Sequence, residues 1–412
     1  MTTTRTLRGL LRGGAGIAVA TAVQNVAAYA FTIAAARRLG PAEYSAVASL
    51  MGLLLVVVVV ALGLQATGAR KIAAAPERRV EIEAAVMAAT YRSALWLGLL
   101  CVLSTPVMAW GLGLDSWAPA LMIGLSAVPL TIMGGQSGVL QGEKRWGSLG
   151  AVYLGVGVGR LLVGGAALAF SPTALAAMVG VALAAWIPAL IGAIALGHLG
   201  RGAARSAVEH GENLLREVAD NSHALLAFFA LSNADVVVAR VVFDEHEAGL
   251  YAGGLILTKA VLFLPQFVVV VAFPTMASAA GRRSVYLKAL ALVAGIGLTA
   301  TLGAWILSDL AVTFIGGPAY ESVRPQIAWF ALLGTLLAMV QILVYEVVAR
   351  QHRASVGWLW VGLVAVAVCG AVVATSGSLL ATVLLIDGAV LMALAVSTHL
   401  LRTRDDAPSP AQ

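Results

Sequence analysis

Two basic residues lie near the middle of long apolar segments of the chain, where an isolated charge is costly. These residues are Arg160 and Lys259. A cation at membrane depth costs at least about 2.5–3.5 kcal/mol and usually faces an interior cavity or a partner of opposite charge. Two cations facing a shared cleft would attract an anionic substrate such as a diphosphate. Alternatively, Asp235 or Asp387, which also lie in apolar segments, could neutralise either cation, or the long side chains could extend to a membrane interface.

Carboxyl and amide side chains form a second set of candidate site residues. Asn233 and Asp235 are two residues apart near the end of an apolar segment, and Asp387 lies in the last such segment. Their oxygens could bind a proton or Na⁺ that couples transport to an ion gradient, or they could simply hydrogen-bond neighbouring helices. Gln24 and Asn25, in the middle of the first apolar segment, could bind sugar hydroxyls or hold helices together.

The motifs of enzymes and of metal sites are missing from the sequence. The six His residues are scattered without HExxH spacing, and there is no GxxxxGK[ST] phosphate loop and no GxSxG elbow. Cys101 and Cys369 lie inside apolar segments, so neither a disulfide framework nor metal-ligand spacing is present. We therefore expect a protein that is not an enzyme and that uses no cofactor and no bound metal.

The composition indicates the elements that must position these residues. Of the 412 residues, 60% are hydrophobic and 11% are charged, and the mean hydropathy is +0.93. Soluble domains carry about 45–50% apolar and about 25% charged residues, so a soluble globule is excluded. The net charge of +6 comes without a basic run interleaved with aromatic residues, so we expect no nucleic-acid partner. Because no segment alternates with a two-residue period, only helices could span the membrane.

Apolar stretches separated by polar residues predict twelve transmembrane helices, and hence an all-α integral membrane protein. The run that follows Arg5, Arg8 and Arg12 is too long for the core of a signal peptide, so we expect a spanning helix there. The predicted helices cover residues 14–36, 44–64, 88–112, 117–140, 147–170, 174–197, 217–241, 248–274, 286–308, 325–349, 355–375 and 378–401.

The distribution of Lys and Arg predicts the orientation in the membrane. An even number of helices places both termini on one side. Of the 26 Lys and Arg residues, twenty fall in the loops on the side of the termini, and two are Arg160 and Lys259. The four on the other side are Arg37, Arg38, Arg240 and Arg324. Because cytoplasmic loops are enriched in Lys and Arg, we expect a multi-pass protein of the cytoplasmic membrane with both termini in the cytoplasm.

A polar stretch at 198–216 separates two predicted halves of six helices each, which we assign to residues 1–204 and 205–412. An internal repeat supports the division, because Arg37 and Arg240 are 203 residues apart and Tyr44 and Tyr251 are 207 residues apart. Halves with an even number of helices face the same way, as in parallel-repeat transporters.

Within the first half, the mixed charged and apolar segment 68–86 predicts a helix lying in the cytoplasmic interface.

Several short segments resemble a known family of membrane proteins. They are Ala34 to Tyr44 (AAARRLGPAEY), Gln141 to Trp146 (QGEKRW), and the stretch from Asn233-Ala234-Asp235 through Ala248-Gly249-Leu250-Tyr251 to Phe273-Pro274. These segments resemble the polysaccharide-export flippases, which include the O-antigen and teichoic-acid transporters, within the multidrug/oligosaccharidyl-lipid/polysaccharide superfamily. The resemblance covers nearly the whole chain, and the Leu-Gly-Pro-x-x-Tyr turn is its most specific part.

This resemblance implies two six-helix bundles around a V-shaped cavity that opens alternately to each side. The expected activity is flipping an undecaprenyl-diphosphate-linked oligosaccharide to the outer leaflet, with Arg160 and Lys259 binding the diphosphate. The expected partners are the lipid-linked glycan, membrane lipids, and a polysaccharide polymerase or glycosyltransferases. Two alternatives stay open: a cation-coupled multidrug exporter with Asp235 as the coupling carboxylate, and a non-transporting membrane scaffold of a polysaccharide synthesis complex.

Overall fold

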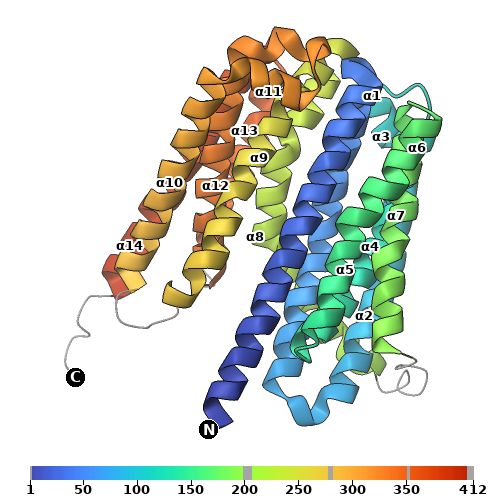
Figure 1. Ribbon diagram of the computed structural model, residues 1–412, viewed down its shortest axis with the longest axis vertical. Helices are drawn as coiled ribbons and strands as arrows, with labels where there is room; N and C mark the ends of the chain where they lie inside the picture. The colour runs from blue at the N-terminus through green and yellow to red at the C-terminus, as the bar shows by residue number, and fades with distance from the viewer. Residues whose placement is uncertain (1, 198–206, 277–281, 350–352, 406–412) are drawn as a thin grey trace. The chain divides into compact units, whose positions relative to one another are not determined.

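The computed structural model describes residues 2–197, 207–276, 282–349 and 353–405, and within these ranges every regular element is a helix (Figure 1). The chain forms two compact units, Met1–His223 and Ala224–Gln412. The predicted boundary at residues 204/205 lies outside the described residues. Helix α8 (Ala207–Val242) begins in the first unit and ends in the second.

The first unit contains the helical segments of predicted helices one to six. They are α1 (Thr2–Ala74), η1 (Pro76–Arg78), α2 (Arg79–Leu103), α3 (Thr105–Gly111), α4 (Ala118–Gly142), α5 (Trp146–Gly159), η2 (Arg160–Gly164), α6 (Gly165–Phe170) and α7 (Ala174–Leu196). Helix α1 combines the first two predicted spans, which meet at Gly40. The third span is divided at Ser104 between α2 and α3, and the fifth is continuous through α5, η2 and α6.

The second unit contains the rest of α8 and the segments of predicted helices eight to twelve. They are α9 (Glu245–Met276), α10 (Arg282–Ile306), α11 (Ser308–Ile315), η3 (Pro318–Gln326), α12 (Ile327–Ala349), α13 (Arg353–Gly370) and α14 (Ser376–Asp405). With α8 as the seventh span, all twelve predicted spans correspond to helical segments. The prediction of an all-α integral membrane protein with about twelve helices is therefore confirmed.

A tight reversal at Gly40 joins the first two spans. Gly40 has φ +70° and ψ 174°, which interrupts the helical conformation inside α1. Residues with a side chain rarely adopt this region, whereas glycine adopts it freely. Pro41 follows and lacks an N–H group, so it is well suited to begin the second helix. The two spans are consequently joined without a polar loop.

The predicted interfacial helix at 68–86 does not form as a separate element. Helix α1 continues to Ala74, a 3₁₀ turn covers Pro76–Arg78, and α2 begins at Arg79. Pro76 cannot extend the preceding helix because it has no N–H donor and clashes with the previous turn. The mixed charged and apolar pattern therefore belongs to the ends of two spanning helices.

Glycines bring the central helices of each unit close together. In the first unit α4 packs on α1, α2 and α7, and a Cβ on Gly134 would lie 2.6 Å from Cα of Ala61. In the second unit α12 packs on α9, α10 and α14, and a Cβ on Gly334 would contact the carbonyl oxygen of Thr258. Small residues at such crossings allow close packing in lipid, where van der Waals contact drives helix association.

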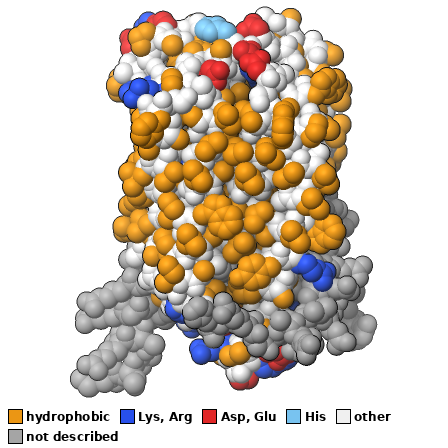
Figure 2. Space-filling model, turned by 90° about the vertical axis from the view of Figure 1, so that its right-hand side faces the viewer, with side chains coloured by type: hydrophobic (Ala, Val, Ile, Leu, Met, Phe, Trp, Pro, Cys, Tyr) orange, Lys and Arg blue, Asp and Glu red, His pale blue; other side chains and the backbone are white. Residues whose placement is uncertain are grey.

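The outer surface is apolar between charged ends. Figure 2 shows a broad band of hydrophobic side chains on one face, with Asp, Glu, Lys and Arg side chains gathered above and below it. Among the described residues, nine segments are long and apolar enough to cross a membrane, and the first of them, Gly16–Ala74, contains two spans. The chain is therefore a multi-pass membrane protein.

Candidate functional site

Four of the predicted site residues gather in the second unit, together with a tyrosine. This group, which we call the carboxylate cluster, contains Asn233 and Asp235 on α8, Tyr251 and Lys259 on α9, and Asp387 on α14. Asn233 and Asp235 are each 3% exposed, Tyr251 and Asp387 are each 1% exposed, and Lys259 is half-buried. Such a concentration of buried polar groups is unusual for a membrane interior and makes the cluster a candidate functional site.

Hydrogen bonds connect α8 and α9 within the carboxylate cluster. Oδ2 of Asp235 accepts a bond from the hydroxyl of Tyr251 at 3.3 Å, and Oδ1 accepts the backbone N–H of Val236 at 2.8 Å. The ammonium of Lys259 donates to Oδ1 of Asn233 at 2.8 Å and also interacts electrostatically with Asp235. Lys259 is therefore held inside the cluster by residues of α8.

Asp387 is the least satisfied member of the carboxylate cluster. Among the described residues, its Oδ1 has no hydrogen-bond partner, and the nearby carboxylate of Asp235 repels its negative charge. A buried carboxylate without a donor is costly. Two neighbouring carboxylates, of which Asp235 also interacts with Lys259, can accept a proton or a small cation, because either would offset the uncompensated negative charge.

Helix geometry explains why these residues meet. Glu247 on α9 accepts a hydrogen bond from the backbone N–H of Ser376 on α14 at 2.9 Å, so the two helices begin at the same level. At a rise of about 1.5 Å per residue, Asp387 lies about 16 Å from Ser376 along α14, and Lys259 lies about 18 Å from Glu247 along α9. Long side chains in helices point back toward the N-terminus, which brings the Lys259 ammonium up to Asn233.

Tyr251 is a member of the cluster that the sequence indicates only as part of a repeat. It lies eight residues before Lys259, two turns along α9 and about 80° around its axis, which is within the width of one helix face. This spacing is the signal that could have identified it. Its ring also makes an edge contact with Phe330 of α12, with centroids 5.3 Å apart, which holds the hydroxyl against Asp235.

Arg160, in the first unit, has no acidic side chain beside it among the described residues. It is half-buried in the middle of the span Trp146–Phe170, and within the same part of the chain it has no hydrogen bond or ion pair. It opens the π-helical turn η2, a local widening of the helix that is frequent at functional sites. One turn earlier, a Cβ on Gly157 would lie 2.5 Å from Cα of Gln24, so the half-buried pair Gln24 and Asn25 on α1 passes close to α5.

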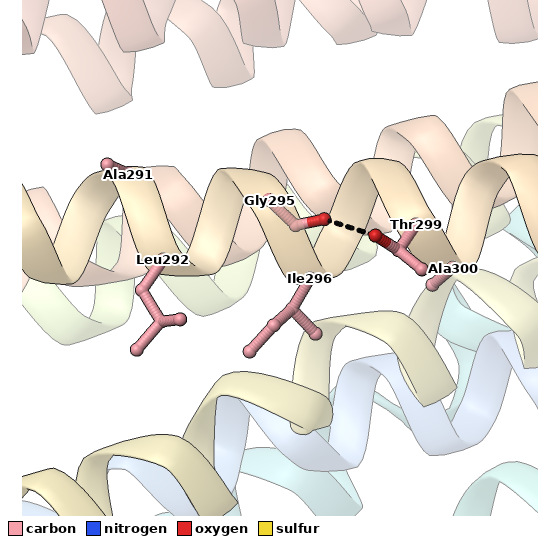
Figure 3. A pocket seen from close by; sticks show the side chains of 6 residues that line it. All are labelled: Ala291, Leu292, Gly295, Ile296, Thr299 and Ala300. Atoms are coloured by element: carbon pink, nitrogen blue, oxygen red, sulfur yellow. Dashed lines mark hydrogen bonds between the residues drawn. The ribbon is translucent and has the colours of Figure 1, made fainter.

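A pocket elsewhere in the second unit has an apolar wall. It has a volume of about 560 Å³ and is lined along one face of α10 (Figure 3) by Ala291, Leu292, Gly295, Ile296, Thr299 and Ala300. The only side-chain hydroxyl in this set, that of Thr299, donates to the carbonyl of Gly295 in its own helix at 2.8 Å. The wall is therefore suited to hydrocarbon and does not include the predicted site residues.

No family model matches the chain, and no curated protein matches it. Among solved structures, it is similar to the eukaryotic MATE transporter AtDTX14, with 12% identity, 95% of each chain covered and a TM-score of 0.61. It is also similar to an outward-facing multidrug resistance MATE family transporter of the MOP superfamily, with 13% identity, 97% of this chain and 96% of that chain covered, and a TM-score of 0.56.

A third similar structure is a MOP superfamily transporter from Pyrococcus furiosus. Its binding pocket is reported to have reverse polarity, which suggests a different function for that protein. The identity is 14%, the coverage is 96% of this chain and 94% of that chain, and the TM-score is 0.55. All three likenesses extend over nearly the full chain. The protein therefore has the fold of the MATE transporters and of the MOP superfamily to which they belong.

Proposed function

We propose that the protein is an alternating-access transporter that flips a lipid-linked oligosaccharide with a diphosphate headgroup across the cytoplasmic membrane. Arg160 is the observation that carries the proposal. A guanidinium at membrane depth without an acidic partner among the described residues repels a cationic drug and attracts a diphosphate. Arginine also binds phosphate through two parallel hydrogen bonds, which gives specificity as well as affinity.

The neighbouring polar residues suit the remainder of such a substrate. Gln24 and Asn25 lie on the helix that packs against α5 at Gly157, and amide groups both donate to and accept from sugar hydroxyls. Lys259, by contrast, is engaged by Asn233, so we assign it to the carboxylate cluster rather than to the substrate. In this proposal Asp235, Asn233 and Asp387 bind the proton or Na⁺ that drives the cycle.

The test is flipping in proteoliposomes that contain an undecaprenyl-diphosphate-linked glycan with a fluorescent label. Loss of a charge-assisted hydrogen bond costs about 1.5–3 kcal/mol, so Arg160→Ala should slow flipping by about tenfold to a hundredfold. Arg160→Lys keeps the charge and should retain part of the rate. Arg324→Ala is the matched control, because Arg324 is exposed and paired with Asp309. Full activity of Arg160→Ala would refute the proposed role.

The second candidate is a cation-coupled multidrug exporter, and the carboxylate cluster favours it. Two buried carboxylates on α8 and α14 provide an ion-coupling site that either kind of transporter could use. A parallel assay with a cationic dye separates the two, because only the exporter should move the dye. Asp235→Asn should abolish ion-driven transport in both cases. Transport of neither substrate would favour a scaffold in a polysaccharide synthesis complex, together with a polymerase or glycosyltransferases.

The proposed orientation places both termini in the cytoplasm. It is supported by the Lys and Arg residues that the sequence concentrates on the side of the termini. A protease-cleavable tag added after Gln412 should resist protease in intact cells and be cut in inside-out membrane vesicles. Cleavage of the tag in intact cells would reverse the orientation.

A further inference from the structure

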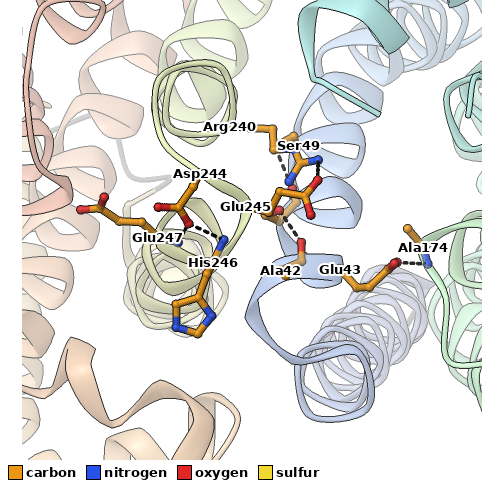
Figure 4. Close-up of polar contacts among 10 residues, drawn as sticks. Ala42, Glu43, Ser49, Ala174, Arg240, Asp244, Glu245, His246 and Glu247 are labelled. Atoms are coloured by element: carbon orange, nitrogen blue, oxygen red, sulfur yellow. Dashed lines mark hydrogen bonds and ion pairs between the residues drawn. The ribbon is translucent and has the colours of Figure 1, made fainter. Parts of the chain in front are cut away.

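Each unit contains a glutamate that holds the start of its last spanning helix. In the first unit, Oε2 of Glu43 accepts the backbone N–H of Ala174, the first residue of α7, at 2.8 Å (Figure 4). The hydroxyl of Thr173 accepts the backbone N–H of Ala176 at 3.2 Å. Two of the N–H groups that a helix leaves unpaired at its start are thus satisfied, one of them by a residue 131 positions away.

The second unit repeats this arrangement with different residues. Oε1 of Glu247 accepts the backbone N–H of Ser376, the first residue of α14, at 2.9 Å. The hydroxyl of Thr375 accepts the backbone N–H of Ser378 at 3.2 Å. Glu247 and Ser376 are 129 positions apart, close to the 131 of the first unit. We call these contacts the Glu43 clasp and the Glu247 clasp.

The clasps join the beginning of the second spanning helix in each half to the beginning of the sixth. Glu43 lies three residues after the reversal at Gly40, and Glu247 lies in the first turn of α9. A carboxylate is favoured at a helix N-terminus by the positive end of the helix dipole as well as by the hydrogen bond. Each clasp therefore sets the position of one helix along the axis of another.

We propose that Glu247 is a positioning residue that aligns Asp387 with the rest of the carboxylate cluster. Glu247 lies one turn before Tyr251 on α9, and Ser376 lies eleven residues before Asp387 on α14. A slip of α14 by one residue moves Asp387 by about 1.5 Å along the axis and by about 100° around it. Such a slip changes the separation of the Asp387 and Asp235 carboxylates, on which their joint binding of a proton or cation depends.

The Glu43 clasp has no carboxylate cluster to align, which makes it the matched control. Helix α7 packs on α5 and η2, and among the described residues it contains no acidic residue. The inference rests on the proposed ion coupling of the carboxylate cluster. It follows that loss of the Glu247 clasp changes the dependence of transport on the driving ion, whereas loss of the Glu43 clasp does not.

The first measurement is the ion concentration that gives half-maximal transport in proteoliposomes. Glu247→Ala should shift this concentration by about tenfold, corresponding to one lost charge-assisted hydrogen bond. Glu247→Gln should stay within about threefold of the wild type, because the amide oxygen still accepts the N–H of Ser376. Glu43→Ala should leave the ion dependence unchanged. Equal shifts in Glu247→Ala and Glu43→Ala, or no shift in either, would overturn the inference.

The second measurement is hydrogen exchange at the two helix starts in detergent, which needs no transport. Glu247→Ala should speed exchange of the amides at Ser376 to Leu379 and leave those at Ala174 to Ala177 unchanged, and Glu43→Ala should do the reverse. Unchanged exchange in both variants would refute the clasps themselves. If the variants show faster local exchange but transport by the wild type does not depend on ions, the proposed ion coupling is refuted and the clasps are not.

Discussion

Replacing Gly157 by Ala should force α1 and α5 apart beside Arg160. The added Cβ would lie 2.5 Å from Cα and 2.8 Å from the carbonyl carbon of Gln24, whereas ordinary contacts begin at 3.4 Å. The two backbones must therefore separate by about 1 Å. Overpacking of this kind costs about 1–3 kcal/mol. Because the neighbouring residues include Gln24 and Arg160, we also expect slower flipping.

The assay is thermal unfolding in detergent, followed by tryptophan fluorescence, with Gly165→Ala as the control on the same span. A Cβ on Gly165 meets no atom within 4 Å, and Ala is a better helix former than Gly by about 1 kcal/mol. Gly165→Ala should therefore match or exceed the wild type, and Gly157→Ala should be about 1–3 kcal/mol less stable than that control. Equal stability of the two variants would refute the close approach of α1 and α5.

Two further predictions concern stability away from the proposed substrate site. Thr258→Val keeps the side-chain shape but removes the 2.8 Å hydrogen bond from the Thr258 hydroxyl to the carbonyl of Phe330, so it should lower the free energy of unfolding by about 1 kcal/mol. The control is Thr299→Val, because the Thr299 hydroxyl bonds only within its own helix, and it should stay within about 0.5 kcal/mol of the wild type. Equal effects of the two substitutions would contradict the role of this contact between α9 and α12. Arg324→Ala removes ion pairs with Asp309 and Glu321 that are exposed to solvent, so it should cost less than about 1 kcal/mol, and a loss of several kcal/mol would show that the pairs are shielded from solvent.

The number and positions of the spanning helices were predictable because the membrane leaves few alternatives. A backbone in hydrocarbon must satisfy its polar groups internally, so each long apolar run forms a helix. The breaks within spans were not predictable. The interruption at Ser104 and the π-turn at Arg160 depend on local packing that changes neither length nor hydropathy. The sequence of residues 68–86 predicts an interfacial helix for a related reason. Its mixture of charged and apolar residues suits the ends of two spanning helices as well as a helix lying in the interface.

The candidate site was partly predictable from the cost of burying ionisable groups. That cost identified Asp235, Lys259 and Asp387, which lie in one cluster. The proximity of Asp235 to Asp387 could not be predicted from the sequence, because it depends on how α14 packs rather than on their distance along the chain. Tyr251 was overlooked because a tyrosine in an apolar segment carries no such cost.

The paired glutamates illustrate a different limit of sequence comparison. Glu43 and Glu247 stand in dissimilar surroundings, Pro-Ala-Glu-Tyr and Glu-His-Glu-Ala. The helices they hold also begin with unlike residues, Ala174 and Ser376. The two glutamates are 204 residues apart, close to the offsets of the internal repeat, but their contacts use a backbone donor in both units. Backbone groups carry no sequence information, so the clasps could not be predicted.

The reversal at Gly40 has a consequence for how the protein is made. With no polar loop between the first two spans, the chain that leaves the ribosome presents one apolar hairpin from Gly16 to Ala74. Arg37 and Arg38, exposed beside the turn, would each cost about 2.5–3.5 kcal/mol to carry to the middle of the bilayer on an insertion scale. The apolar residues on both sides of the turn offset that cost better together than either run does alone. We therefore expect the first two spans to insert as a helical pair rather than as single helices.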